Sequence, residues 1–466
     1  MRDAWSLVLL GALGLGGCNR SASAEGTGSS AHTPSPATPS VASSLGGVAS
    51  AMPVGMGSSR DQASHVEVVR RGERFALLYN GSPYAIRGIG GRMRVQQAAQ
   101  WGANSVRTWH SDDAQVAFEF AAQFDLTVFA GLWLSQDPKD YASQEYKAKK
   151  RAELSDLLAR YAHNPHLLVW ALGNEIQLGA DVPEAWQFVE ELAQLVAKHD
   201  KNHPIATVTA HAPLSVIRHI AQYAPSISLL GVNSYGGLEN VPRELDAGGY
   251  HGPFVITEWG PDGHWEVPLT TWGRPIEQSS AEKGRMYASR YALMQSWQQR
   301  CLGSYAFLWG QKQERTPTWY GVFVEDRPDI GLHGETMPPV DALASAWSGK
   351  PVSALAPQVS GLLLNGKKPI DSLILNSGQP VEAQAQLTDN GSNSLRFIWE
   401  LLQEPTQLGK GGSFEPRPPR VEHALTPQGA HAMLKAPAPG EYRLFFYAID
   451  DQHHKLGTAN FPFKVQ

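Results

Sequence analysis

Net charge, cysteine and metal-binding motifs are all scarce in this sequence. The formal charge is −5 over 466 residues, and the Lys and Arg residues are scattered, which argues against a nucleic-acid partner. The two cysteines, Cys18 and Cys301, stand in no zinc-type spacing with histidine, so we expect no metal site and no cofactor. A G-x-S-x-G nucleophile elbow is also absent, which argues against a serine hydrolase.

The longest apolar run lies near the N-terminus. It covers Trp5–Leu15 and is too short to span a bilayer as a mature helix. The run ends in Leu15-Gly16-Gly17-Cys18, which resembles the signal of bacterial lipoproteins. This resemblance implies cleavage that leaves Cys18 as a lipidated N-terminus; a plain secretory signal is the alternative. We therefore expect a protein of the bacterial envelope, lipid-anchored at the periplasmic face or in the outer membrane, or a secreted one.

Composition separates a tether from the folded part. Residues 1–18 are the expected signal peptide, and residues 19–63 are rich in Ser, Ala, Gly, Thr and Pro, which predicts a flexible tether. Lipidation of Cys18 would leave no intramolecular disulfide, so Cys301 is expected to be a small buried hydrophobe. A short hairpin over residues 66–69 and 74–79, closed through Asn80-Gly81, is expected to open the folded part.

From residue 64 to residue 350, short apolar runs alternate with helical patterns. Eight strands that alternate with helical patterns, without leftover strands, predict an α/β fold, the closed (β/α)8 TIM barrel. A doubly wound sheet is the alternative, but Gly88-Ile89-Gly90-Gly91 lacks the G-x-G-x-x-G spacing that such a fold uses. The predicted strands are 84–90, 105–109, 127–134, 167–172, 205–209, 227–233, 254–258 and 304–309, and the predicted helices are 113–123, 139–162, 183–198, 214–223, 242–246, 280–299 and 340–348.

The pattern changes again over residues 351–466. Short alternating strands are separated there by Asn-Gly, Pro-rich and Pro-Gly turns. This predicts a small antiparallel sandwich of immunoglobulin-like type, acting as an accessory module that packs on the barrel or binds polymer. Its predicted strands are 362–364, 381–387, 395–402, 430–435, 442–449 and 461–465.

Two predicted strands each end in a carboxylate. The fourth leads into Asn174-Glu175, and the seventh ends at Glu258. Residues at the carboxyl ends of barrel strands carry chemistry. One such carboxylate could simply cap the next helix, but two, from two strand ends, are what the cleavage of a glycosidic bond needs.

The surrounding residues resemble a known family. Trp170-Ala171-Leu172-Gly173-Asn174-Glu175 and Ile256-Thr257-Glu258-Trp259-Gly260 resemble the two signatures of the retaining β-glycosidases of glycoside hydrolase clan A. The closest likeness, over residues 75–348, is to the barrel of glycoside hydrolase family 2, which includes β-galactosidases and β-glucuronidases. The resemblance implies that Glu175 is the general acid/base and that Glu258 is the nucleophile. Family 2 enzymes carry further domains before the barrel, so substrate size stays open.

The same resemblance suggests further site residues. Asn174 could bind the sugar 2-hydroxyl. Arg107 and Tyr235 resemble the clan's arginine and tyrosine that hold the nucleophile, and Asn233 lies in the same Asn233-Ser234-Tyr235 motif. Sugar rings present apolar faces to aromatic side chains. Aromatic residues expected at the groove are Trp109, Trp133, Trp259, Trp265, Trp309, Trp319 and Tyr320, with Trp309 resembling the platform beneath the reactive sugar; His110 and His211 either bind sugar or serve the loop backbone.

These features predict a retaining glycosidase that cleaves β-glycosidic bonds of an oligo- or polysaccharide. Its partners would be the carbohydrate substrate and, through the lipid anchor, a membrane. Two alternatives remain. One is a β-glucan transglycosylase that uses the same residues. The other is a non-catalytic carbohydrate-binding lipoprotein of the envelope.

Overall fold

The computed structural model describes residues 62–388, 395–409 and 412–466. The predicted signal peptide, the lipidation site Cys18 and most of the tether lie outside these ranges and stay predictions. The described residues, from 62 onward, group into one compact unit. In the described ranges, no helix is both long and apolar enough to cross a bilayer.

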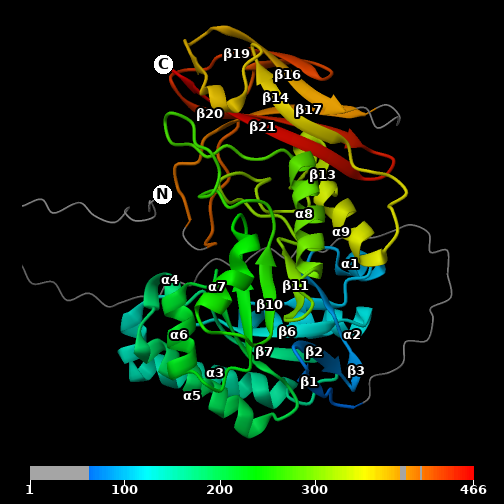
Figure 1. The fold of residues 1–466 in the computed structure, drawn as a ribbon. Helices are drawn as coiled ribbons and strands as arrows, with labels where there is room; N and C mark the ends of the chain where they lie inside the picture. Colours follow the sequence, from blue (N-terminus) through cyan, green and yellow to red (C-terminus); the bar gives the residue numbers. More distant parts are fainter. Residues whose placement is uncertain (1–61, 389–394, 410–411) are drawn as a thin grey trace, which may run out of the picture. The chain divides into compact units, whose positions relative to one another are not determined.

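Eight parallel strands close into a barrel, which confirms the predicted α/β fold (Figure 1). Neighbouring strands follow chain order, and the last strand pairs with the first. Parallel strands covered on both faces are rich in apolar residues, and Leu167–Asn174 is buried at every position. The strands are β4 (Ile86–Gly90), β5 (Ser105–Arg107), β6 (Thr127–Leu132), β7 (Leu167–Asn174), β8 (Ile205–Ala210), β9 (Leu229–Asn233), β10 (Phe254–Trp259) and β11 (Cys301–Phe307).

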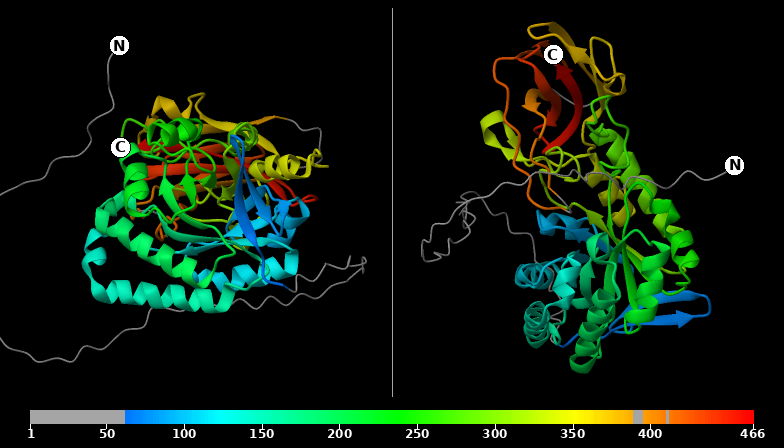
Figure 2. Two further views of the ribbon diagram at one scale, coloured as in Figure 1. Left: turned by 60° about the horizontal axis from the view of Figure 1, so that its bottom comes forward. Right: turned by 90° about the vertical axis from the view of Figure 1, so that its left-hand side faces the viewer.

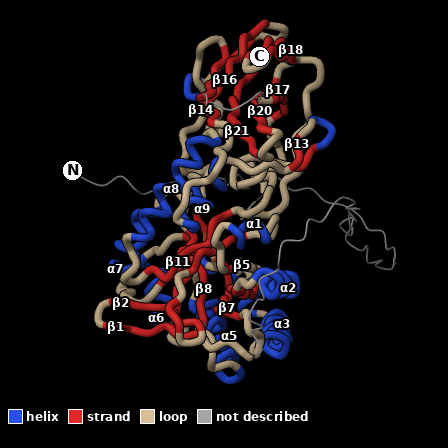
Figure 3. Tube along the Cα trace, turned by 90° about the vertical axis from the view of Figure 1, so that its right-hand side faces the viewer, coloured by secondary structure: helices blue, strands red, loops and turns tan. Residues whose placement is uncertain are grey.

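Helices surround this barrel and cover its strands (Figures 2 and 3). Their ends carry the expected signals: Pro183 occupies the first turn of its helix, and Ser279 and Glu282 form a capping box. The helices are α1 (Val95–Gln100), α2 (Ala114–Phe124), α3 (Gln144–Tyr161), α4 (Gln177–Ala180), α5 (Pro183–His199), α6 (Leu214–Tyr223), α7 (Val241–Ala247), α8 (Ser280–Gln295) and α9 (Pro338–Ser348).

The N-terminal hairpin differs from its prediction. Its strands β1 (Val66–Arg71) and β2 (Arg74–Tyr79) are joined by Gly72-Glu73, so the predicted closure through Asn80-Gly81 is wrong. Asn80 and Gly81 both have positive φ and form a turn, as their types favour, but that turn leads from β2 into β3 (Ser82–Pro83).

The C-terminal part is all-β, as predicted. Two four-stranded sheets enclose a hydrophobic core of their own. The predicted alternation is visible in β16 (Pro380–Thr388), where Val381, Ala383 and Ala385 are buried between exposed neighbours. One sheet has the order β14 (Gln358–Leu364), β16, β19 (His431–Lys435), β18 (Leu425–Gln428), and the other has β15 (Ile374–Leu375), β21 (Lys455–Val465), β20 (Gly440–Asp450), β17 (Arg396–Gln403); between barrel and sandwich lie the short β12 (Asp326–Arg327) and β13 (Leu332–His333).

Buried polar groups join the sandwich to the barrel. Glu277, between β10 and α8, accepts a hydrogen bond from Lys283 Nζ at 2.5 Å and another from Asn460 of β21 at 2.5 Å. Arg443 of β20 donates to the carbonyl of Pro275 at 2.9 Å. Burial opposes ionisation of Glu277, but the Lys283 ammonium outweighs it, so the carboxyl's pKa lies below its usual value. The sandwich therefore takes part in the barrel's buried electrostatics, a role that an accessory module does not require.

Replacing Lys283 by Met should lower the free energy of unfolding by about 3–5 kcal/mol, because it leaves the Glu277 carboxylate buried and without its cation. Urea unfolding measures this loss. Lys149→Met, on the exposed face of α3, should change stability by less than about 0.5 kcal/mol. The double variant Glu277→Gln/Lys283→Met should recover part of the loss. An unchanged midpoint in Lys283→Met would show that the ion pair does not hold the fold.

Candidate active site

Glu175 and Glu258 both stand at the carboxyl end of the barrel. Glu258 is the penultimate residue of β10, and Glu175 directly follows β7. The chain bends sharply at the end of β7, since Gly173 and Glu175 have positive φ of 84° and 52°. A Cβ on Gly173 would lie 2.4 Å from Ile176 Cδ1, so this bend needs glycine. The bend sets the direction of Glu175, whose backbone N–H donates to the Val208 carbonyl at 2.8 Å.

One amide group connects the two glutamates. Asn233 is the last residue of β9, and its Nδ2 donates to Glu175 Oε1 and to Glu258 Oε1, at 2.9 Å each. These two carboxylate oxygens therefore lie no further apart than twice this hydrogen-bond length. The Asn233 Oδ1 is fixed in turn, because it accepts a hydrogen bond from Thr257 Oγ1 at 2.8 Å.

Glu258 is surrounded by hydrogen-bond donors. Its Oε1 accepts from Arg107 Nη1 at 2.9 Å and from Trp109 Nε1 at 2.7 Å, and its Oε2 accepts from the Tyr235 hydroxyl at 2.9 Å. The Arg107 side chain is only 1% exposed, so its charge acts on Glu258 with little screening. Burial, and then the charge of Glu258, raise the pKa of Tyr235, which keeps the phenol a donor. Glu258 thus accepts charge-assisted and neutral hydrogen bonds on both of its oxygens.

Glu175 stands in a different environment. Burial, and then the negative charge of Glu258, raise the pKa of Glu175 from 4.5 to about 7. Glu175 therefore holds a proton near neutral pH, as the chemistry of a general acid requires.

The remaining predicted polar residues also gather here. The Oδ1 of Asn174 accepts from Arg107 Nη2 at 2.6 Å and from Asn233 Nδ2 at 3.1 Å, which leaves the NH2 group of Asn174 for other partners. His110 stacks on Trp133 with ring centroids 4.9 Å apart, and both remain partly or fully exposed. His211 is held by Ser234 Oγ at 3.3 Å from its Nδ1.

Several predicted groove aromatics prove to be core residues. Trp259 and Trp309 are fully buried, so the prediction that they contact sugar is corrected. Trp259 directly follows Glu258 in the strand and therefore points to the opposite side, where it packs on Tyr287 of α8 at 5.1 Å between ring centroids. Trp309 lies two residues beyond β11 and packs on Trp347 at 5.7 Å. Trp319 and Tyr320 are buried as well, whereas Trp109, Trp133 and Trp265 are accessible.

Phe307 was not predicted as a site residue. It ends β11, remains half-buried, and lies edge-on to Trp109 and Tyr235, at 5.8 and 6.1 Å between ring centroids. It thus occupies the place beside Glu258 that the sequence assigned to Trp309. The prediction ran the eighth strand two residues too far, and the correct strand end would have pointed to Phe307.

No three or more His, Cys, Asp or Glu side chains of the described ranges are grouped to hold a metal ion. His199 and His203 do have the four-residue spacing of some metal sites. However, His203 uses both ring nitrogens elsewhere, on Asp200 Oδ2 at 2.7 Å and on Ser64 Oγ at 2.8 Å. This histidine has a structural role where the chain enters the barrel.

The chain is similar in sequence to proteins of known family. A β-glucuronidase of Paenibacillus borealis is 27% identical over 194 residues, which make up 36% of this chain and 31% of that protein. The chain is similar to β-glucuronidases. This confirms the resemblance that the two motifs predicted, over a stretch that spans about a third of the curated relative. No family model matches the chain.

Two β-glucuronidases are among the solved structures to which the chain is similar. The enzyme of Ruminococcus gnavus in complex with a C6-substituted uronic isofagomine has a TM-score of 0.48 at 16% identity, covering 61% of this chain and 52% of that one. The β-glucuronidase of Parabacteroides merdae has a TM-score of 0.45 at 12% identity, covering 86% of this chain and 51% of that one.

Proposed function

We propose that the chain is a retaining β-glycosidase with Glu258 as nucleophile and Glu175 as general acid/base. The Asn233 amide is the observation that supports this most, because it donates to both carboxyl groups at 2.9 Å. Carboxyl groups lie about 5–5.5 Å apart in retaining glycosidases and about 6.5–9.5 Å apart in inverting ones. Two oxygens that share one donor nitrogen fit the shorter spacing.

In the first step, a Glu258 oxygen bonds to the anomeric carbon while the bond from that carbon to the leaving oxygen breaks. Glu175 gives its proton to that oxygen. In the second step, a hydroxyl gives its proton to Glu175, its oxygen bonds to the anomeric carbon, and the ester to Glu258 breaks. Arg107, Trp109 and Tyr235 support the first step, because they orient the attacking carboxylate and stabilise its charge.

The substrates that we propose are β-linked oligo- or polysaccharides. The half-buried rings of Phe307 and Trp109, beside Glu258, suit the apolar face of a sugar. β-Glucuronides are the first class to test, because the curated relative carries that name. Water as acceptor gives hydrolysis, and a sugar hydroxyl gives the transglycosylation considered above. The proposed place of action, the bacterial envelope, rests on the sequence around Cys18.

Product stereochemistry tests the proposal. The purified protein would be incubated with β-linked gluco-, galacto-, manno-, xylo- and glucuronosyl substrates, and proton NMR would follow the first anomer released. We expect the β-anomer first. Longer products would identify transfer, and an α-anomer would overturn the retaining mechanism. Sugar binding without turnover on the whole panel would favour the non-catalytic carbohydrate-binding protein instead.

A further inference from the structure

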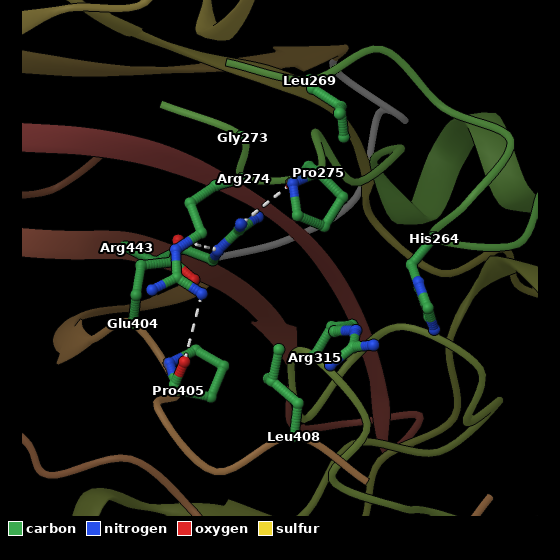
Figure 4. Close-up of a pocket in the computed structure, with 10 residues that line it drawn as sticks. All are labelled: His264, Leu269, Gly273, Arg274, Pro275, Arg315, Glu404, Pro405, Leu408 and Arg443. Carbon is green, nitrogen blue, oxygen red and sulfur yellow. Dashed lines mark hydrogen bonds and ion pairs between the residues drawn. The ribbon is translucent and has the colours of Figure 1, made fainter. Parts of the chain in front are cut away.

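A pocket of about 180 Å³ lies where loops of the barrel meet the sandwich (Figure 4). The barrel contributes the segment after β10 and the loop after β11, and the sandwich contributes the segment after β17 and a residue of β20. Three arginines line it, together with one glutamate. The arginines are Arg274, Arg315 and Arg443, and the glutamate is Glu404.

The three arginines differ in how fully they are paired. Arg443 donates to Glu404 and Asn460 at 2.8 Å each, and its side chain is buried. Arg274 donates to Glu441 at 2.6 Å and to a backbone carbonyl. The Arg315 guanidinium has only a long contact of 3.5 Å, to Glu415, and no other acceptor in residues 62–388, 395–409 and 412–466. Arg315 is therefore the arginine with free N–H groups at this pocket.

The backbone fixes Arg315 in place. It has a positive φ of 62°, which is costly for a residue with a side chain. Its own N–H donates to Glu415 at 2.7 Å, and the Gly409 N–H donates to the same carboxylate at 2.9 Å. Glu415 is thus occupied by backbone donors, and the loop conformation is held from the sandwich side. Strain of this kind is typical of sites where a side chain must point in one direction.

The other walls suit a carbohydrate. Leu269 and Leu408 line the pocket and are 53% and 46% exposed, so they offer apolar contact at its rim. His264 also lines it; burial, and then the charge of Arg315, lower the pKa of this imidazole to about 4, so it can exchange hydrogen bonds as a neutral group at pH 7. The charged group of the pocket with the weakest pairing is therefore the Arg315 guanidinium.

Ring contacts lead from this pocket to the candidate active site. His264 lies 4.8 Å from Trp265, which is 56% exposed, and Trp265 lies edge-on to Tyr235 at 6.0 Å, between ring centroids. Tyr235 in turn donates to Glu258. A polysaccharide bound at the two glutamates could thus pass over Trp265 and place a later unit in the pocket.

We propose that this pocket is an accessory subsite in which Arg315 binds an anionic substituent, a carboxylate or a sulfate ester, on a sugar unit remote from the cleaved bond. That the ligand is a sugar chain rests on the proposed function; that it carries an anion rests on the pocket alone. A guanidinium suits both groups, because it presents paired N–H donors to two oxygens. The substrate class would then be an acidic β-linked polysaccharide, and the sandwich would contribute to substrate choice.

Three tetrasaccharides of equal length test the subsite. One is β-linked and contains glucuronate; the second is the same chain with its carboxyl groups reduced to alcohols; the third carries sulfate esters on those alcohols. Binding to Glu258→Gln would be measured by calorimetry, with and without Arg315→Gln. We expect at least one anionic chain to bind about tenfold more tightly than the reduced chain, and Arg315→Gln to remove that preference. The preferred anion identifies the substituent.

A second pair of variants avoids the Arg315–Glu415 contact. Leu408→Asp should weaken binding of the anionic chain by repulsion, while Leu408→Asn, of the same size, should not. Arg160→Gln, on exposed α3, serves as the control for a lost arginine.

Equal binding of all three chains, or a preference that survives Arg315→Gln, would overturn the proposal. With a short aryl glycoside, Arg315→Gln should keep the wild-type kcat/KM, so failure of the subsite and failure of the catalytic assignment are told apart.

Discussion

Glu258→Gln should lower kcat by about 10⁴-fold or more, because it removes the atom that forms the bond to the sugar. The amide is nearly isosteric with the carboxylate, so the fold should survive. The substitution also replaces an acceptor of the Arg107, Trp109 and Tyr235 hydrogen bonds by a group that is neutral. The measurement is kcat on an aryl glycoside that the wild type turns over.

A matched control and a direct test accompany this variant. Glu239→Gln, exposed in the loop after β9, should keep full activity. A 2-deoxy-2-fluoro glycoside with a good leaving group should label the wild type once, and mass spectrometry should find the added mass on the peptide that contains Glu258. Label on another carboxylate, or activity of Glu258→Gln within tenfold of the wild type, would remove Glu258 from the role of nucleophile.

Glu175→Gln should act in a way that depends on the leaving group. An alkyl or sugar leaving group needs the proton of Glu175, so kcat/KM should fall by about 10²–10⁴-fold. Dinitrophenolate is a leaving group that departs without that proton, so kcat/KM for a dinitrophenyl glycoside should change little. Such a split between substrates is not expected from general damage to the fold.

The pH profile gives a second readout of Glu175. Since this residue acts first as an acid, and its pKa lies at about 7, kcat/KM of the wild type for alkyl glycosides should fall as the pH rises through 7. This decline should be absent from Glu175→Gln. A decline with the same midpoint in the variant would show that another group carries the proton.

The sequence predicted the barrel well, because buried parallel strands and covering helices leave different periodicities. The sequence also predicted that Arg107, Asn174 and Tyr235 lie near the two glutamates, because all of them stand at or just after the carboxyl ends of strands. It did not predict the shared amide of Asn233. Which atoms one side chain reaches depends on the tilt of three neighbouring strands, and no local pattern records that.

The misassigned residues have the same kind of cause. Trp259 and Trp309 were placed in the groove by their positions near strand ends. Successive side chains of a strand point to opposite faces, so Trp259 points away from the side that Glu258 faces. Strand β11 ends at Phe307, two residues earlier than predicted, so Phe307 and not Trp309 lies at the site. The contact of Asn460 with Glu277 joins residues 183 positions apart, so it could not be read from either segment alone.

The ion pair of Arg107 with Glu258, close to Glu175, has a consequence for the proposed cycle. In the resting site, Glu258 carries one negative charge and Glu175 a proton. In the glycosyl-enzyme, Glu258 is an ester, and Glu175 has given its proton away. At each stage one negative charge faces the one positive charge of Arg107, and the Asn233 amide lies within reach of both carboxyl groups that carry it in turn. The summed charge of these three side chains therefore stays constant through turnover, because the proton that Glu175 gives to the leaving oxygen is replaced by the one that the acceptor hydroxyl brings.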